Sequence, residues 1–280
     1  MMNKHFPCIE FEDVKDVKER KIYIQWILYN SYNNSLIGSG YYGQHYLYQF
    51  DNNLNIKKRG FIMYSQSKTS QTSRYITASS VQNYTGNYLF TNWQTRYIVV
   101  YSPDFNLMYY IKITDDMYSI RRRFTYAMPS MCSDVYGNIY TITDRHSIIH
   151  KFNEKGLFIK TAQYLNYKIL RSDCICQYKS QIISANSFHG TLNIYDNDLR
   201  IISNHKIHEG EKIAFYPKCQ NLDNLLYIQY NKDIYCYDMR KILPDNNKPL
   251  DIIKVNSDDV SFTIVDGRLL ISEEDKLYYH

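Results

Sequence analysis

One short pattern recurs along the whole chain: a run of strand-forming residues that ends in an aromatic residue and is followed by a turn. The aromatic residues that end these runs are separated by 51, 51, 43, 42 and 42 positions; they are Phe50, Tyr101, Phe152, Tyr195, Tyr237 and Tyr279. Six units at a nearly constant period indicate a repeat architecture in which each unit is one supersecondary element. This recurrence limits the possible folds more than any single motif does.

The first five units each contain the signals of four antiparallel strands, and the sixth contains those of three. A polar turn such as Asn33-Asn34, Gly86-Asn87 or Asp266-Gly267 stands ahead of a second strand in each unit. Asn, Asp and Gly reach the positive φ that a tight hairpin needs, so these turns predict a hairpin between the first and second strands. Another strand follows the aromatic residue after a polar turn, as at 107–110. Four short strands in one such repeat are typical of a β-propeller blade.

We therefore predict an all-β fold, a six-bladed β-propeller of four-stranded antiparallel blades that forms a single domain over residues 1–280. The expected blades span approximately 23–60, 76–113, 127–164, 171–207, 214–256 and 261–280. The sixth unit has no fourth strand, whereas residues 6–12 precede the first unit without a partner of their own. We expect residues 6–12 to pair in the last blade and close the ring, since this removes an open sheet edge. The alternative is an open β-sandwich or two unrelated β domains.

The composition agrees with a strand-rich fold. Tyrosine accounts for 30 of the 280 residues, and its ring covers a half-buried pleated surface while the hydroxyl stays hydrated. Apolar residues make up 44% and charged residues 22%, which is typical of a globular protein and argues against disorder. No helix-period segment of useful length separates the predicted strands.

These repeats resemble the β-propeller repeat superfamily, with a WD40-like or NHL-like architecture, over essentially the whole chain. Tryptophan occurs only at positions 26 and 93, no Trp-Asp pair ends a strand, and no Gly-His pair opens a blade. The resemblance is therefore one of architecture and points to no specific member. It implies a rigid ring of short strands whose loops vary freely and carry recognition.

Catalytic and cofactor motifs are absent from the sequence. It contains no Gly-x-Ser-x-Gly and no glycine loop of the P-loop or Rossmann type. Cys174 and Cys176 lie two apart on one predicted strand, but no second Cys or His pair has zinc spacing. We expect no catalytic residue, no metal and no cofactor. Some six-bladed propellers are calcium-dependent lactonases whose axial ligands form no linear motif, so a metal-dependent hydrolase of this type is the alternative function.

The six cysteines, at positions 8, 132, 174, 176, 219 and 236, are scattered through predicted strands. No apolar segment of signal-peptide length is visible, and no apolar run is long enough to span a bilayer. We therefore expect reduced, buried thiols and a cytoplasmic or other intracellular soluble compartment.

Aromatic and basic residues gather in the loops expected on one face of the ring. The first two units are about nine residues longer than the others, and the excess falls in the connections near 64–74 and 114–125. Trp, Tyr and Arg are enriched at interface hot spots. The predicted partner-binding residues are Tyr41, Tyr42, Trp93, Arg121, Arg122, Arg123, Phe124, Phe188 and His189.

These features predict a non-enzymatic scaffold that binds another protein or peptide through one loop face. In the plainer interpretation, Arg121–Arg123 form a solvated run and Trp93 covers a blade edge. RNA binding through the arginines and exposed aromatic residues is a further possibility. The net charge of +5 and the pI near 8.7 are small for a nucleic-acid module, so RNA ranks last.

Overall fold

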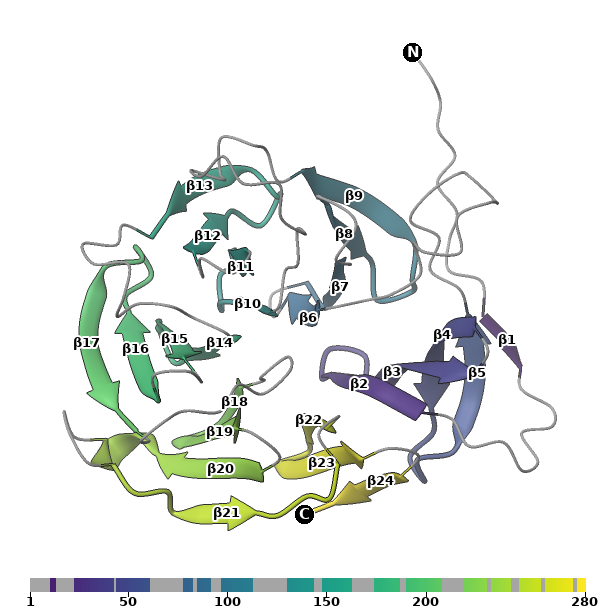
Figure 1. The fold of residues 1–280 in the computed structure, drawn as a ribbon. Helices are drawn as coiled ribbons and strands as arrows, with labels where there is room; N and C mark the ends of the chain where they lie inside the picture. The colour runs from purple at the N-terminus through teal and green to yellow at the C-terminus, as the bar shows by residue number, and fades with distance from the viewer. Residues whose placement is uncertain are drawn as a thin grey trace.

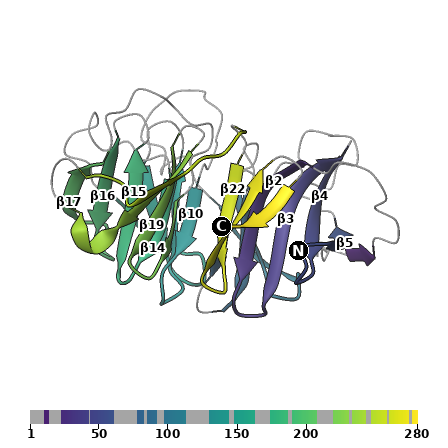
Figure 2. The same ribbon diagram turned by 90° about the horizontal axis from the view of Figure 1, so that it is seen from below.

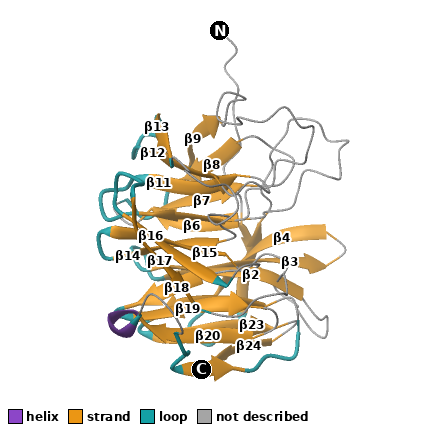
Figure 3. Cartoon of the chain, turned by 60° about the vertical axis from the view of Figure 1, so that its left-hand side comes forward, coloured by secondary structure: helices purple, strands orange, loops and turns teal. Residues whose placement is uncertain are grey.

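The computed structural model of the protein shows six antiparallel sheets arranged around a central axis (Figure 1). It describes residues 11–13, 23–42, 44–60, 78–82, 85–91, 97–112, 130–143, 148–162, 174–186, 190–207, 219–230, 233–242, 247–257, 260–273 and 276–280. In these residues the chain is almost entirely strand, with η3 (Met239–Lys241) as the single short helix (Figure 3). The predicted six-bladed, all-β propeller is confirmed.

The blades are numbered here in chain order. Blade 1 holds β2 (Tyr23–Asn30), β3 (Ser35–Tyr42), β4 (Gln44–Phe50) and β5 (Ile56–Gly60), with β1 (Phe11–Asp13) added at its edge. Blade 2 holds β6 (Ala78–Gln82), β7 (Asn87–Thr91), β8 (Tyr97–Tyr101) and β9 (Leu107–Lys112). Blade 3 holds β10 (Ser130–Ser133), β11 (Ile139–Thr143), β12 (Ile148–Phe152) and β13 (Phe158–Thr161).

The second half of the chain repeats this arrangement up to its last sheet. Blade 4 holds β14 (Cys174–Tyr178), β15 (Gln181–Asn186), β16 (Thr191–Tyr195) and β17 (Ile201–Lys206). Blade 5 holds β18 (Cys219–Leu222), β19 (Leu225–Tyr230), β20 (Asp233–Asp238) and β21 (Asp251–Ile253). Blade 6 holds β22 (Val260–Val265), β23 (Arg268–Glu273) and β24 (Lys276–Tyr279). In every blade the first strand is innermost, and the strands run between two faces of the ring (Figure 2).

The hairpin turns behave as the sequence predicts. Each turn between the first and second strands holds at least one residue with positive φ: Asn34, Gly86, Gly137, Lys179, Asp223, and Asp266 with Gly267. A second type of turn recurs between the third and fourth strands of blades 1–4. Its fourth residue has positive φ and is Leu54, Phe105, Gly156 or Leu199. Phe105 and Leu199 are buried, so packing offsets the cost of a left-handed backbone at a bulky residue.

Six separate apolar cores hold the ring together, one at each junction between blades. Two consecutive residues of every second strand point to opposite neighbours. Leu36, for example, packs at the junction of blades 6 and 1, whereas Ile37 packs at the junction of blades 1 and 2. The corresponding pairs are Tyr88 and Leu89, Ile139 and Tyr140, Ile182 and Ile183, Leu226 and Tyr227, and Leu269 and Leu270. Alternation across a pleated strand produces this two-sided burial.

The predicted place of the N-terminal strand is wrong for its described part. Phe11 and Glu12 pair with β5 on the outer edge of blade 1, and not with the segment 277–279. Residues 6–10 lie outside the described residues. The register sets the acidic Glu12 and Asp13 opposite basic residues of β5, and opposite charges across neighbouring strands favour such a pairing. β5 contains three consecutive basic residues, at 57–59, whereas β24 contains only one.

The ring closes instead through its inner strands. β2 of blade 1 lies beside β22 of blade 6, and the apolar core between them includes Ile24, Ile27, Val265 and Leu270. Blade 6 is a three-stranded sheet in the described residues. Closure therefore depends on packing between two sheets and needs no strand shared by both. Among the described residues, no helix has the length and apolar character needed to span a membrane.

Candidate functional site

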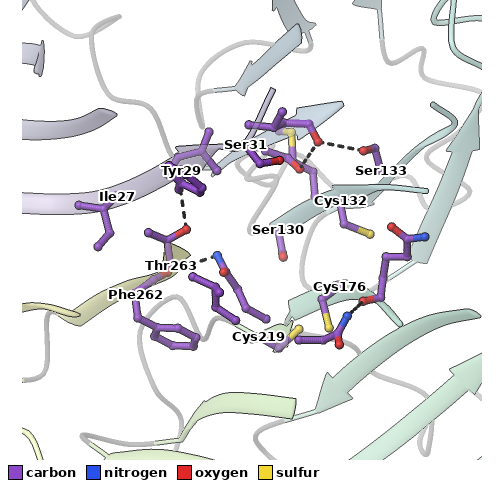
Figure 4. A pocket seen from close by; sticks show the side chains of 18 of the residues that line it. Ile27, Tyr29, Ser31, Ser130, Cys132, Ser133, Cys176, Cys219, Phe262 and Thr263 are labelled. Carbon is purple, nitrogen blue, oxygen red and sulfur yellow. Dashed lines mark hydrogen bonds between the residues drawn. The ribbon is translucent and has the colours of Figure 1, made fainter. Parts of the chain in front are cut away.

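The innermost strands of all six blades surround a cavity at the ring axis, with a volume of about 650 Å³. Hydroxyl, amide and thiol side chains line it together with apolar ones, as Figure 4 shows for Ser130, Cys132, Cys176, Cys219 and Thr263. An axial cavity with polar groups is a common place for a ligand in a ring-shaped fold. The bonds that these polar groups form decide what the cavity can do.

Serine and threonine side chains on the inner strands bond to the backbone of the neighbouring blade. The Oγ of Ser130 in blade 3 accepts the N–H of Ile175 in blade 4 at 3.1 Å. The Oγ of Ser133 donates to the C=O of Val81 in blade 2 at 2.9 Å. At the closing junction, the Oγ of Ser261 accepts the N–H of Ile27 at 2.9 Å. Backbone N–H and C=O groups on the free inner edge of one blade therefore find hydrogen-bond partners in the neighbouring blade.

Amide side chains form the same kind of bond at the other junctions. The Nδ2 of Asn30 donates to the C=O of Gly86 at 2.8 Å, linking blades 1 and 2. The Nδ2 of Asn221 donates to the backbone C=O of Gln177 at 2.7 Å, linking blades 5 and 4. The Nε2 of Gln220 donates to the C=O of Phe262 in blade 6 at 3.3 Å; Phe262 is labelled in Figure 4. Such a bond crosses every junction, so much of the polar lining serves to hold the ring together.

The cavity also contains thiols from three consecutive blades: Cys132, Cys176 and Cys219. Burial raises the pKa of the Cys132 and Cys219 thiols well above the usual range. Both are therefore neutral at physiological pH and poor nucleophiles, because the thiolate is the reactive form. Five cysteines are free and buried, as predicted, and Cys8 lies outside the described residues. Among the described residues, no group of three or more His, Cys, Asp or Glu side chains is arranged to hold a metal ion.

His150 is the one fully buried histidine in the part of the chain that the structure describes. Burial lowers the pKa of its imidazole to about 4, so the ring is neutral at pH 7. Its Nδ1 lies 2.9 Å from the Oγ1 of Thr161, which links β12 to β13. His150 does not line the axial cavity, and this arrangement supports a structural role. His146, four positions before His150, lies outside the described residues, and so does His208.

The predicted partner-binding residues are largely outside the described residues. The backbones of Tyr41 and Tyr42 belong to the end of β3, where they pair with His45 and Gln44 of β4. Their side chains are not described, and neither are Trp93, Arg121, Arg122, Arg123, Phe124, Phe188 and His189. The loop-face site therefore stays a prediction.

The structure shows a second candidate surface that the sequence analysis missed. Large apolar side chains are exposed on, or directly before, the outer strands of blades 2–5. They are Met108, Leu157, Phe158, Ile159, Ile201, Ile202, Leu250 and Ile252. Consecutive apolar residues at 157–159 and 201–202 signal this surface, because neighbouring residues of a strand point to opposite sides. We call these eight residues the apolar rim.

Outer regions of blades 3 and 4 lie next to each other along this rim. The Nζ of Lys151 donates to the C=O of Asn197 at 2.7 Å, and the Nζ of Lys160 lies 4.0 Å from Asp198. β13 and β17 follow each other on the outside of the ring in Figure 1. The exposed residues of these two strands therefore belong to neighbouring blades.

Comparison with solved structures supports the fold. The chain is similar to a structure titled U3-55K, with a TM-score of 0.55 and 8% identity over 86% of this chain and 67% of that one. It is also similar to virginiamycin B lyase from Staphylococcus aureus, with a TM-score of 0.53 and 10% identity over 73% of this chain and 62% of that one. No family model and no curated protein matches the chain. At these identities the similarity shows the fold alone.

Proposed function

We propose that the protein is a non-enzymatic scaffold that binds another protein or peptide. The apolar rim is the observation that supports this proposal most directly. Phe158 is 45% exposed, Ile202 is 53% exposed and Leu157 is 65% exposed. Exposed large apolar side chains that are grouped mark interaction sites more often than scattered ones do. Leu157 and Phe158 are adjacent in blade 3, and Ile202 lies in the neighbouring blade 4.

The axial cavity gives less support to an enzyme. Hydroxyl and amide side chains that line it bond to neighbouring blades, and its Cys132 and Cys219 thiols have raised pKa values. A catalytic site usually gathers titratable groups whose pKa values suit proton transfer at the working pH. A rigid ring with exposed apolar side chains is better suited to partner binding.

Affinity purification from cells tests the scaffold proposal. Phe158→Asp combined with Ile202→Asp places two charges on the apolar rim, and we expect it to reduce recovery of the bound protein at least tenfold. Val135→Asp is the matched control, since Val135 is 52% exposed in the β10–β11 turn, away from the outer strands. Equal recovery of the partner by the wild type, the rim variant and Val135→Asp would show that the apolar rim is not the binding surface.

The predicted loop face is tested in the same experiment. Arg121→Ala with Arg122→Ala and Arg123→Ala, or Trp93→Ala, should weaken partner recovery without lowering the melting temperature if that face takes part. If both loop variants and the rim variant recover as much partner as the wild type, neither surface binds it. That result would contradict the scaffold proposal.

A further inference from the structure

Blade 6 has an open outer edge in the described part of the chain. Its third strand, β24, has no neighbour on the outer side, whereas β5, β9, β13, β17 and β21 fill that place in the other blades. Figure 1 shows β24 on the outside of the ring, at the position where a fourth strand would follow. An open strand edge is a template for pairing with another chain.

The register of β24 shows which main-chain groups point outward. The N–H of His280 donates to the C=O of Leu269 at 2.9 Å. In an antiparallel pair, residues that bond to the partner strand alternate with residues whose N–H and C=O point the other way. Leu277 and Tyr279 therefore direct their main-chain groups away from β23, and each offers one donor and one acceptor to an added strand.

Side-chain contacts hold this edge in place. The guanidinium of Arg268 lies 4.2 Å from the centre of the Tyr279 ring. The hydroxyl of Tyr278 donates to the carboxylate of Glu273 at 2.9 Å. Leu277 packs against the apolar core of the closing junction. A fixed edge loses little conformational freedom when a strand is added, which favours binding.

Two exposed basic side chains lie on β24 and on the adjacent strand β23. Lys276 on β24 and Arg268 on β23 are exposed, and neither forms an ion pair within the described residues. Glu273, the acid of the β23–β24 hairpin that lies within the described residues, accepts the backbone N–H groups of Asn256 and Ser257. Burial raises the pKa of Glu273, but these bonds and that from Tyr278 outweigh it, and its pKa is lowered overall. Its charge is therefore engaged internally.

The chain itself provides an example of the strand that such an edge accepts. β1 adds antiparallel to the outer edge of blade 1, where it sets Glu12 and Asp13 opposite Arg59 and Lys58. An acidic strand is thus paired with a basic outer strand in the adjacent blade. The same complementarity at blade 6 requires acidic residues that can reach Lys276 and Arg268.

We propose that β24 is a docking edge for an acidic, extended segment of a partner protein, which adds to blade 6 as its fourth strand. Main-chain bonds to Leu277 and Tyr279 would supply affinity, and the basic side chains would select acidic sequences. This inference rests on the scaffold proposal and assigns it a second site, separate from the apolar rim.

A peptide titration tests the docking edge. The probe is an acetylated eight-residue peptide that alternates valine and glutamate, and its control alternates valine and lysine. We expect the acidic peptide to bind the full-length protein at least tenfold more tightly than the lysine peptide. Tyr279→Pro should weaken its binding at least tenfold, because proline removes an outward N–H and leaves the bonds to β23 intact.

Asn204→Pro is the matched control variant, since Asn204 has the same outward register on β17, the outer strand of blade 4. It should bind the acidic peptide as the wild type does. Equal binding to the wild type and Tyr279→Pro, or no binding at about 1 mM peptide, would overturn the proposal. So would slow amide exchange at Leu277 and Tyr279 in the free protein, since that would show the edge already covered by this chain or a second copy.

The two proposals fail separately. A partner that is lost from the rim variant but retained by Tyr279→Pro would leave the scaffold proposal standing and contradict the docking edge. A wild-type protein that recovers no partner would contradict the scaffold proposal, whereas the peptide titration would still decide whether β24 accepts a strand.

Discussion

Blades 1 and 6 are neighbours in the ring, yet their outer edges differ. Blade 1 has five strands because β1 covers β5, whereas blade 6 has three strands in the described residues. Their inner strands are nevertheless joined by an apolar core and by the bond from Ile27 to Ser261. The difference shows that the outer strands can vary while the junction at the inner strands stays the same.

The closing junction also resembles an internal one. Leu270 in blade 6 and Ile183 in blade 4 occupy the same position in their second strands, and each is completely buried against the next blade. Neither junction shares a strand between two sheets. In the described residues, the closing junction therefore has the same kind of apolar core as an internal junction.

Core truncation at these two positions tests that equivalence and should have the largest effect. Leu270→Ala and Ile183→Ala each leave a cavity, and each is expected to lower the free energy of unfolding by about 3–4 kcal/mol. Denaturant unfolding of both variants measures this loss in the free energy of unfolding. A loss at Leu270 much smaller than at Ile183 would show that the closing junction is weaker than an internal one.

Acid should weaken blade 3, which has the fourth, outer strand that is absent from blade 6 in the described residues. The pKa of His150 is about 4 in the folded protein and about 6.5 in the unfolded chain. Below pH 6.5 the unfolded chain takes up a proton that the folded protein does not, so stability falls until the pH reaches about 4. The expected loss approaches about 3 kcal/mol.

Unfolding measured between pH 7 and pH 4, with His150→Gln as the control, isolates this contribution. The variant should lose the part of the pH dependence that the wild type shows below pH 6.5. An identical pH dependence in both proteins would mean that His150 is not held neutral in the folded state.

The bonds between inner strands should have a smaller effect. Ser261→Ala at the closing junction and Ser130→Ala at an internal one each remove the acceptor of a backbone N–H, from Ile27 and Ile175. An N–H left without a partner costs about 1–2 kcal/mol. Thermal unfolding of both variants should give similar losses. A negligible loss at Ser261 alone would indicate that the closing junction opens to water.

The sequence predicted the ring because its signals are local. Each unit carries its own aromatic marker, such as Tyr195, and its own hairpin turn, such as Lys179, so the number of blades follows from counting units. The partner of β1 could not be found this way. Outer strands of different blades look alike in sequence, and pairing between distant segments depends on their arrangement in space.

The candidate surfaces were predicted less well, for a related reason. Exposure on an outer strand depends on the neighbouring blade, so Phe158 and Ile202 resemble core residues in sequence. The polar residues of the inner strands, such as Ser130, had no evident role until the adjacent blade supplied a backbone partner. Trp93 and residues 121–123 of the predicted loop face lie outside the described residues.

Removal of residues 1–13 tests most directly whether the inner strands close the ring. The truncated protein loses β1 but keeps the junction between β2 and β22. We predict a single cooperative unfolding transition and a loss of stability of less than about 1 kcal/mol, as is typical of changes outside a core. A loss as large as that of Leu270→Ala, or unfolding in two stages, would contradict closure by the inner strands.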